Sequence, residues 1–188
     1  MVASKKIIGE KVSLAYISMG DADNLANWLN DFEVSLPLGY EAYTPTSAER
    51  IRNEVNSIIN SNQHVFSISD NENNQCIGRC ALFNIDFINR TSMLSILIGN
   101  KNHWNQGFGK ESITLLIDYG FNLLNLNSIN LSVFSFNENA INCYKSVGFK
   151  EVGHLRQARI IGKNSYDSIV MDILSEEFSG KIIPHYIK

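Results

Sequence analysis

The sequence predicts a mixed α/β fold: about seven mostly antiparallel strands in one sheet, flanked by about four helices. Two observations predict this fold. Strand-like segments follow one another directly in two parts of the chain, which is typical of antiparallel strands, and a single strand–helix–strand alternation lies between these parts. The length of 188 residues suits a single domain, 1–188, with a substantial core. Strand and helix alternate only once or twice, which argues against a doubly wound parallel sheet.

The N-terminal third is expected to contain one strand and two helices. Residues 11–18, "KVSLAYIS", are typical of a strand. Apolar residues recur at helical spacing over residues 21–32 and again over 48–60, so each segment should form an amphipathic helix. Two prolines and a glycine interrupt residues 33–47, which we expect to be a loop.

The remaining chain is predicted to supply six further strands and two helices. The strands are expected at 64–69, 75–86, 91–99, 128–134, 150–159 and 166–174. One helix should run from about 108 to 124, between two of these strands. The other should begin after Asn137 as N-cap and end at Gly148, where a left-handed residue closes a helix.

Composition and charge exclude several classes of function. Sixteen basic and nineteen acidic residues give a net charge of −3 without a basic run, so the chain lacks the footprint of a nucleic-acid-binding protein. No stretch reaches 18 apolar residues and the N-terminus has no apolar signal core, which predicts a cytoplasmic protein without membrane contact. Cys76, Cys80 and Cys143 match no metal-ligand spacing, so we expect reduced thiols and no metal.

The segment "WNQGFGK", residues 104–110, follows an apolar strand and opens a helix. Backbone amides at such a helix start are unpaired and lie at the positive end of the helix dipole. Gly107 and Gly109 remove the side chains that would keep a diphosphate away from those amides. No Lys-Ser/Thr pair follows, and a third glycine is absent, so neither a nucleoside-triphosphate loop nor a dinucleotide fingerprint is indicated.

The strand, the glycine loop and its helix, the strand "INLSVFSF" and the segment "NENAINCYKSVGF" together resemble the core of the GNAT superfamily of acetyl-CoA-dependent N-acetyltransferases. The resemblance covers about residues 75–174, and the preceding element order agrees with it. The closing "GHLRQARIIGKNSYDSIVMDIL" is similar to the subgroup of ribosomal-protein alanine and spermidine acetyltransferases. Where family members often carry Arg or Gln, three residues before the first loop glycine, this chain has Trp104.

The resemblance implies a site for acetyl-CoA, which is a co-substrate. The pyrophosphate would be held by the backbone amides of Gln106, Gly107, Phe108, Gly109 and Lys110. The pantetheine arm would lie along the exposed backbone of Leu97 and Ile98, on a strand that the family splays away from its neighbour. Asn137 would hydrogen-bond the pantetheine or act as a helix N-cap, and the two roles are compatible.

Tyr144 stands at the family's proton-donor position, although its position on an apolar helix face also suits a core tyrosine. No general base is assigned, since the strand holds Met93 where many relatives carry glutamate. Glu33, Glu41 and Asp86 are the carboxylates nearest to segments expected to face substrate, but each also suits a solvated loop or turn. His103 is expected to be a surface histidine.

The acceptor is open between a small-molecule amine and a protein N-terminus. The aromatic residues Trp28, Tyr40 and Tyr43 either line an amine pocket by cation–π contact or pack against helices. Direct transfer in a ternary complex is expected, because no cysteine stands in a motif suited to an acyl-enzyme. A non-catalytic CoA-binding or regulatory module is the alternative. The C-terminal "KIIPHYIK" is either a homodimer contact or a tail.

Overall fold

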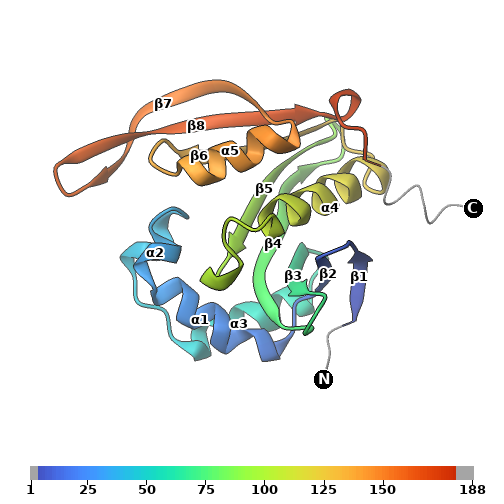
Figure 1. Cartoon of the computed structure of the whole chain (residues 1–188), viewed down its shortest axis with the longest axis vertical. Coiled ribbons are helices and arrows are strands. Elements are labelled where there is room, and N and C mark those ends of the chain that lie inside the picture. The colour runs from blue at the N-terminus through green and yellow to red at the C-terminus, as the bar shows by residue number, and fades with distance from the viewer. Residues whose placement is uncertain (1–3, 181–188) are drawn as a thin grey trace, which may run out of the picture.

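The computed structural model describes residues 4–180 and contains one eight-stranded sheet with the strand order β1-β2-β3-β4-β5-β6-β8-β7 (Figure 1). The strands are Lys5–Ile8 (β1), Val12–Tyr16 (β2), His64–Asp70 (β3), Cys76–Asp86 (β4), Thr91–Ile98 (β5), Ser128–Phe134 (β6), Lys150–Ile161 (β7) and Asn164–Leu174 (β8). The α-helices of the described residues are Ala22–Asn30 (α1), Phe32–Ser35 (α2), Ala48–Ile59 (α3), Phe108–Asn122 (α4) and Glu138–Val147 (α5). The predicted mixed α/β fold is confirmed.

The sheet opens in its middle, between β5 and β6. These two strands are parallel, and they pair only from Thr91 opposite Ser128 to Met93 opposite Asn130. Every other neighbouring pair in the sheet is antiparallel. Beyond Met93 the two strands diverge, so the far half of β5 lacks a hydrogen-bonding neighbour on that side. The splay expected from the family resemblance is therefore present.

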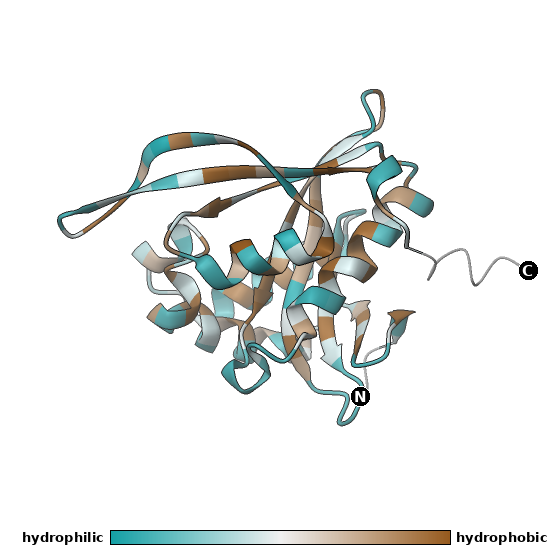
Figure 2. Cartoon of the chain, turned by 45° about the horizontal axis from the view of Figure 1, so that its top comes forward, coloured by the Kyte–Doolittle hydropathy of each residue, from teal (hydrophilic) through white to brown (hydrophobic). Residues whose placement is uncertain are grey.

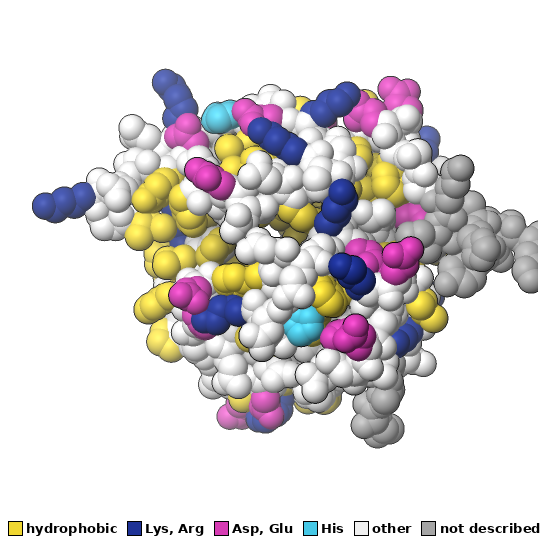
Figure 3. Space-filling view, viewed as in Figure 1, with side chains coloured by type: hydrophobic (Ala, Val, Ile, Leu, Met, Phe, Trp, Pro, Cys, Tyr) yellow, Lys and Arg dark blue, Asp and Glu magenta, His cyan; other side chains and the backbone are white. Residues whose placement is uncertain are grey.

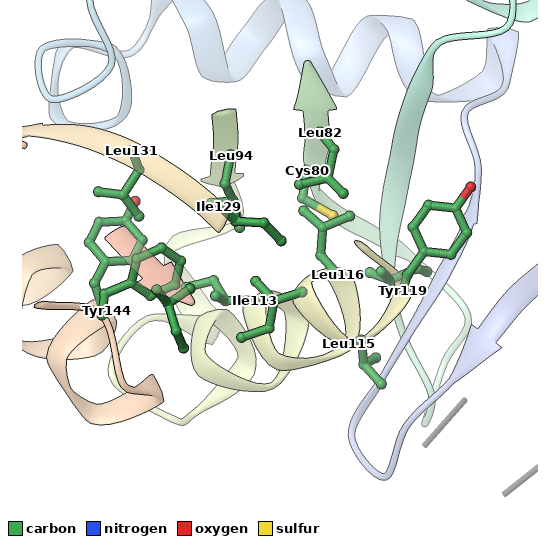
Figure 4. Close-up of a cluster of buried hydrophobic side chains, with 14 of the residues drawn as sticks. Cys80, Leu82, Leu94, Ile113, Leu115, Leu116, Tyr119, Ile129, Leu131 and Tyr144 are labelled. Atoms are coloured by element: carbon green, nitrogen blue, oxygen red, sulfur yellow. The ribbon is translucent and has the colours of Figure 1, made fainter. Parts of the chain in front are cut away.

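Helices cover both faces of the sheet. Alternating side chains of a strand point to opposite faces, and Val65 and Phe66 of β3 pack into two different clusters. The larger cluster joins the sheet to α4 and α5, and Figure 4 shows α4 residues such as Leu116 against Cys80 and Leu82 of β4. The second cluster lies under α1 and α3. Hydrophobic positions accordingly concentrate on the strands and along one side of each helix (Figure 2).

The helix caps of α5 agree with the sequence. Asn137 accepts a hydrogen bond from the Ala140 amide through its side-chain oxygen at 3.2 Å, which makes it the N-cap. Gly148 ends the helix with a φ of +119°, and its amide donates to the carbonyls of Tyr144 and Lys145. The helix is thus fixed at both ends by residues that were identified from sequence.

Three predictions about the elements were wrong in detail. The strand β1 was missed, since it has four residues and only Ile7 is buried; it raises the strand number from about seven to eight. The first helix ends at Asn30 because Asp31 is extended, with a ψ of 117°. Asp31 then caps α2 by accepting from the Glu33 amide at 3.0 Å. The expected loop 33–47 also contains the 3₁₀ helix Tyr40–Tyr43.

Two further findings concern the parts of the chain that the structure describes. No helix within residues 4–180 combines the length and apolar character needed to cross a membrane. The segment 181–188, for which a dimer contact or a tail was expected, lies outside the described residues.

Candidate active site

A cavity of about 890 Å³ occupies the opening between β5 and β6. Figure 3 shows an opening near the middle of one face of the molecule, with hydrophobic side chains at its walls. The cavity is lined by the splayed half of β5, the start of α4, one face of α5 and the segment after α1. The predicted site residues that line it are Leu97, Ile98, Gly107, Gly109, Lys110, Asn137 and Tyr144. The structure therefore brings together residues that lie up to 47 positions apart in sequence (144 − 97).

The glycine loop presents free backbone amides beside this cavity. Gly107 is the N-cap of α4 in a left-handed conformation, with φ at +88°. Within the described residues, the amides from Gln106 to Lys110 donate no hydrogen bond, while the Glu111 amide already donates to the Gly107 carbonyl. A β-carbon added at Gly107 would have only Lys11 nearby, at 3.8 Å from its Nζ. The backbone amides of the loop are thus unpaired hydrogen-bond donors at the positive end of a fifteen-residue helix.

The backbone groups of β5 that face the opening toward β6 are not those of Leu97, as the sequence analysis expected. The Leu97 carbonyl faces β4, because it would lie 2.0 Å from a β-carbon added at Gly78. The Ile98 carbonyl accepts a hydrogen bond from the Trp104 indole at 2.7 Å. Since backbone groups alternate in direction along a strand, the groups left facing β6 are those of Ile96 and the Ile98 amide.

Tyr144 lies in the hydrophobic core, as a core tyrosine would, and it also lines the cavity. Its side chain packs edge to face against Phe149, with ring centroids 5.8 Å apart. Figure 4 shows the ring beside Leu131 of β6. Burial raises the pKa of the Tyr144 phenol well above its ordinary value of 10, and the neighbouring Cys143 adds to the shift. The phenol is therefore neutral at physiological pH.

Two of the three candidate carboxylates reach the cavity. Glu33 and Glu41 both line it. Glu33 is paired with Lys101 at 2.6 Å, whereas Glu41 has no hydrogen bond or ion pair among residues 4–180. Asp86 does not line the cavity and caps a turn, accepting from the amides of Ile88 at 2.8 Å and Asn89 at 2.9 Å. The turn interpretation of Asp86 is the correct one.

The aromatic residues form no amine pocket. Trp28 packs against the backbone of Gly99, where an added β-carbon would lie 2.0 Å from the indole ring. Tyr40 is 87% exposed, and Tyr43 stacks on the guanidinium of Arg159. None of these rings lines the cavity, so packing and solvent contact account for them.

Two residues beside the glycine loop differ from the sequence analysis: His103 was expected at the surface, and Lys11 was not identified. His103 lines the cavity with a side chain only 14% exposed, and its Nε2 lies 3.2 Å from Oδ2 of Asp70. It is therefore no surface histidine. Lys11 donates from Nζ to the Gln106 carbonyl at 2.9 Å, across 95 sequence positions. No local pattern signals either contact, because both partners come from the distant β1–β2 and β3–β4 regions.

The cavity also contains Cys143, in the helical turn of Tyr144. Burial raises the pKa of its thiol, against a smaller opposite effect of Lys110, so the thiol is protonated.

Among residues 4–180, no cluster of histidine, cysteine and carboxylate side chains is arranged to hold a metal ion.

Comparison with known proteins agrees with this geometry. A family model described as an acetyltransferase (GNAT) domain matches residues 14–170. The chain is 31% identical over 173 residues to the uncharacterised N-acetyltransferase p20 of Bacillus licheniformis, covering 91% of this chain and 97% of that protein. It is 28% identical over 172 residues to spermidine N(1)-acetyltransferase of Vibrio cholerae, with 91% and 97% covered.

Solved structures show the same likeness in three dimensions. The crystal structure of spermidine N-acetyltransferase from Vibrio cholerae in complex with CoA and spermine has a TM-score of 0.76 and 27% identity, and the match covers 90% of this chain and 98% of that chain. The fold, the splayed strands and the matched residues lead to one conclusion: the chain belongs to the GNAT family of acetyl-CoA-dependent acetyltransferases.

Proposed function

We propose that this enzyme transfers the acetyl group of acetyl-CoA directly to a primary amine of a small molecule, in a ternary complex. The observation that carries the proposal is the cavity itself, which is lined by the glycine loop with its free backbone amides, by a neutral tyrosine and by two carboxylates. A thioester and an amine bound in this cavity would meet between β5 and β6.

The amides from Gln106 to Lys110 are the proposed pyrophosphate site, and Lys11 and Lys110 add positive charge beside them. The unpaired backbone groups of Ile96 and the Ile98 amide are placed to bond the pantetheine amides, as an added strand would. Asn137 uses its side-chain oxygen as the helix cap, so its Nδ2 group is left to donate to the same arm.

The chemical step needs a neutral amine, a polarised carbonyl and a proton for the leaving thiolate. Tyr144 supplies that proton: its O–H bond breaks as the carbon–sulfur bond breaks, and the phenol is restored by a proton from solvent. Cys143 stays protonated and takes no acetyl group, which favours direct attack by the amine over an acyl-enzyme. The proton that the attacking nitrogen loses passes to solvent water, since no side chain is assigned as its base.

A small-molecule amine is favoured over a protein N-terminus because relatives that align over nearly the whole chain are spermidine acetyltransferases. The acidic end of the cavity supports the same choice. Glu41 has no partner among the described residues and is free to attract an ammonium group, whereas Glu33 shares the ammonium group of Lys101 with Asp31, at 2.6 and 2.7 Å.

The test is release of free thiol from acetyl-CoA against an amine panel that contains spermidine, spermine, aminosugars, aminoglycosides and Ala- or Ser-starting peptides. Calorimetry of acetyl-CoA binding accompanies it. Turnover of a small amine supports the proposal, and turnover of the peptides alone would overturn the acceptor class. Tight acetyl-CoA binding without any turnover would identify a non-catalytic CoA-binding protein, and absence of binding would refute the site.

A further inference from the structure

The edge strand β7 has a single buried side chain, and it is an arginine. Arg159 is 5% exposed, whereas nearly all other β7 residues face solvent. The pairing register with β8 shifts between Leu155 and Arg159, and Gln157 takes a φ of +53° there. Asp167 of β8 fixes this bulge by accepting from the Gln157 amide at 2.9 Å. Beyond the bulge Arg159 pairs with Tyr166 of β8, and its side chain is buried.

The buried guanidinium contacts the segment that follows α2. Its Nη1 donates to the Gly39 carbonyl at 2.7 Å, and Nη2 donates to the Leu36 carbonyl at 3.3 Å. The same group lies 4.4 Å from the ring centroid of Tyr43 and 5.1 Å from that of Phe134 on β6. One side chain thus joins β7 and β6 to residues 36–43, across about 120 sequence positions.

Stability does not account for this arginine. Among the described residues it has no ion pair, and its Nε is buried without a hydrogen-bond partner. A buried charge compensated only by carbonyls and ring faces is costly compared with an apolar side chain of similar volume. The segment it holds has a second property: Pro37, Leu38 and Glu41 line the cavity.

From these contacts we propose that Arg159 is a positioning residue: it holds the acceptor-side loop, residues 36–43, against the end of the β7–β8 hairpin and so sets the affinity for the acceptor amine. In Figure 1 this hairpin extends above α2, where the loop begins. The kinetic part of this inference rests on the proposed function, because it takes Glu41 and its neighbours as the acceptor end of the cavity. Arg159 itself does not line the cavity, so it acts through the loop.

Hydrogen exchange measured by mass spectrometry tests the structural part without any need for turnover. Arg159→Ala is expected to increase exchange in peptides covering 36–43, while peptides of α4 and β5 keep their protection. Arg159→Lys retains one donor and the positive charge, so it should lie between the wild type and the alanine variant. Arg156→Ala removes an exposed arginine from the same strand and should change nothing. Unchanged exchange at 36–43 in a folded Arg159→Ala variant would overturn the proposal.

Kinetics tests the functional part. Arg159→Ala should raise the KM for the amine by about tenfold, the effect of losing one or two charge-assisted hydrogen bonds, and leave the acetyl-CoA dissociation constant within about twofold. Arg159→Lys should recover part of the loss and remain informative if the alanine variant fails to fold. Equal loss of affinity for both substrates would show a merely structural role and refute positioning. A wild type that acetylates no amine refutes the proposed function. The hydrogen-exchange result would still show whether Arg159 holds residues 36–43 in place.

Discussion

The two ends of the cavity are built in different ways. The proposed acetyl-CoA end is made by two continuous segments, β5 with the glycine loop and the start of α5 with its cap, and much of it is backbone. The proposed acceptor end is made by side chains and a loop with long-range contacts: Lys101 bonds Glu33 across 68 positions and Arg159 bonds Gly39 across 120. A backbone site is encoded locally by glycines and caps, whereas a side-chain site depends on the whole fold.

Tyr144 belongs to the acetyl-CoA end, and its loss should have the largest effect. Tyr144→Phe keeps the ring that packs on Phe149 and removes the proton donor. We expect kcat to fall by about a hundredfold, the usual size of a general-acid contribution, while calorimetry should show unchanged acetyl-CoA affinity. Because burial raises the pKa of this phenol above 10, the wild-type rate should show no alkaline decline attributable to Tyr144 up to about pH 9.

Tyr119→Phe is the matched control for that experiment. Tyr119 is also a buried tyrosine on the adjacent helix, with its pKa raised by burial, but it hydrogen-bonds His64 and does not line the cavity. The control should lose some stability and keep kcat. If both variants turn over as fast as the wild type, Tyr144 has no part in the chemistry.

Gly107→Val tests whether the backbone cradle carries acetyl-CoA affinity. A branched residue at φ +88° is strained by about 1–2 kcal/mol, and its side chain would enter space that the structure leaves open. We expect at least about a tenfold rise in the acetyl-CoA dissociation constant. Gly162→Val, at φ +62° with nothing within 4 Å, imposes similar strain in the β7–β8 turn and should leave affinity unchanged. Equal affinities in all three proteins would remove the phosphate site from the loop.

The same contrast explains how much the sequence could predict. The glycine loop and the caps Asn137 and Gly148 follow from spacing within one or two elements, whereas the interest of Tyr144 came from the family resemblance. The structure forms both caps and brings Gly107, Gly109 and Tyr144 to the cavity. The contacts of His103 with Asp70 and of Lys11 with Gln106 join elements that only the folded sheet brings together. Their sequence surroundings contain no periodic pattern that marks them.

The fold shows this limit as well. The β1 strand is too short for an alternating pattern, and its pairing with β2 alone makes it a strand. At Arg159 no sequence feature marks the register shift between Leu155 and Arg159 or the burial of this side chain. Sequence reasoning therefore identified Glu33 and Glu41 as carboxylates near the cavity, but not the long-range contacts of Arg159 with residues 36–39.

At the acceptor end, Glu41→Gln should have a moderate effect. Removing the one unpaired carboxylate among the described cavity residues should raise the KM for a cationic amine by about three- to tenfold, and the effect should shrink as salt is added. The KM for acetyl-CoA should not change. Glu49→Gln removes the same charge from the exposed first turn of α3 and is the control. Equal KM values for wild type and Glu41→Gln would show that this carboxylate does not recognise the acceptor.

The smallest effect is expected at Cys143, which lines the cavity next to Tyr144 in sequence. An acyl-enzyme would need a thiolate, because the thiolate is the nucleophile and the neutral thiol reacts poorly. Burial raises the pKa of Cys143, so the reactive form is scarce at neutral pH even though the side chain lines the cavity. Cys143→Ala should therefore keep turnover within about twofold. Intact mass after incubation with acetyl-CoA alone should show no added acetyl group. An acetyl adduct present in the wild type and absent from Cys143→Ala, together with lost turnover, would replace direct transfer by a two-step route. It would also make a side chain on α5, rather than the amine held at the acceptor end, the first group to receive the acetyl.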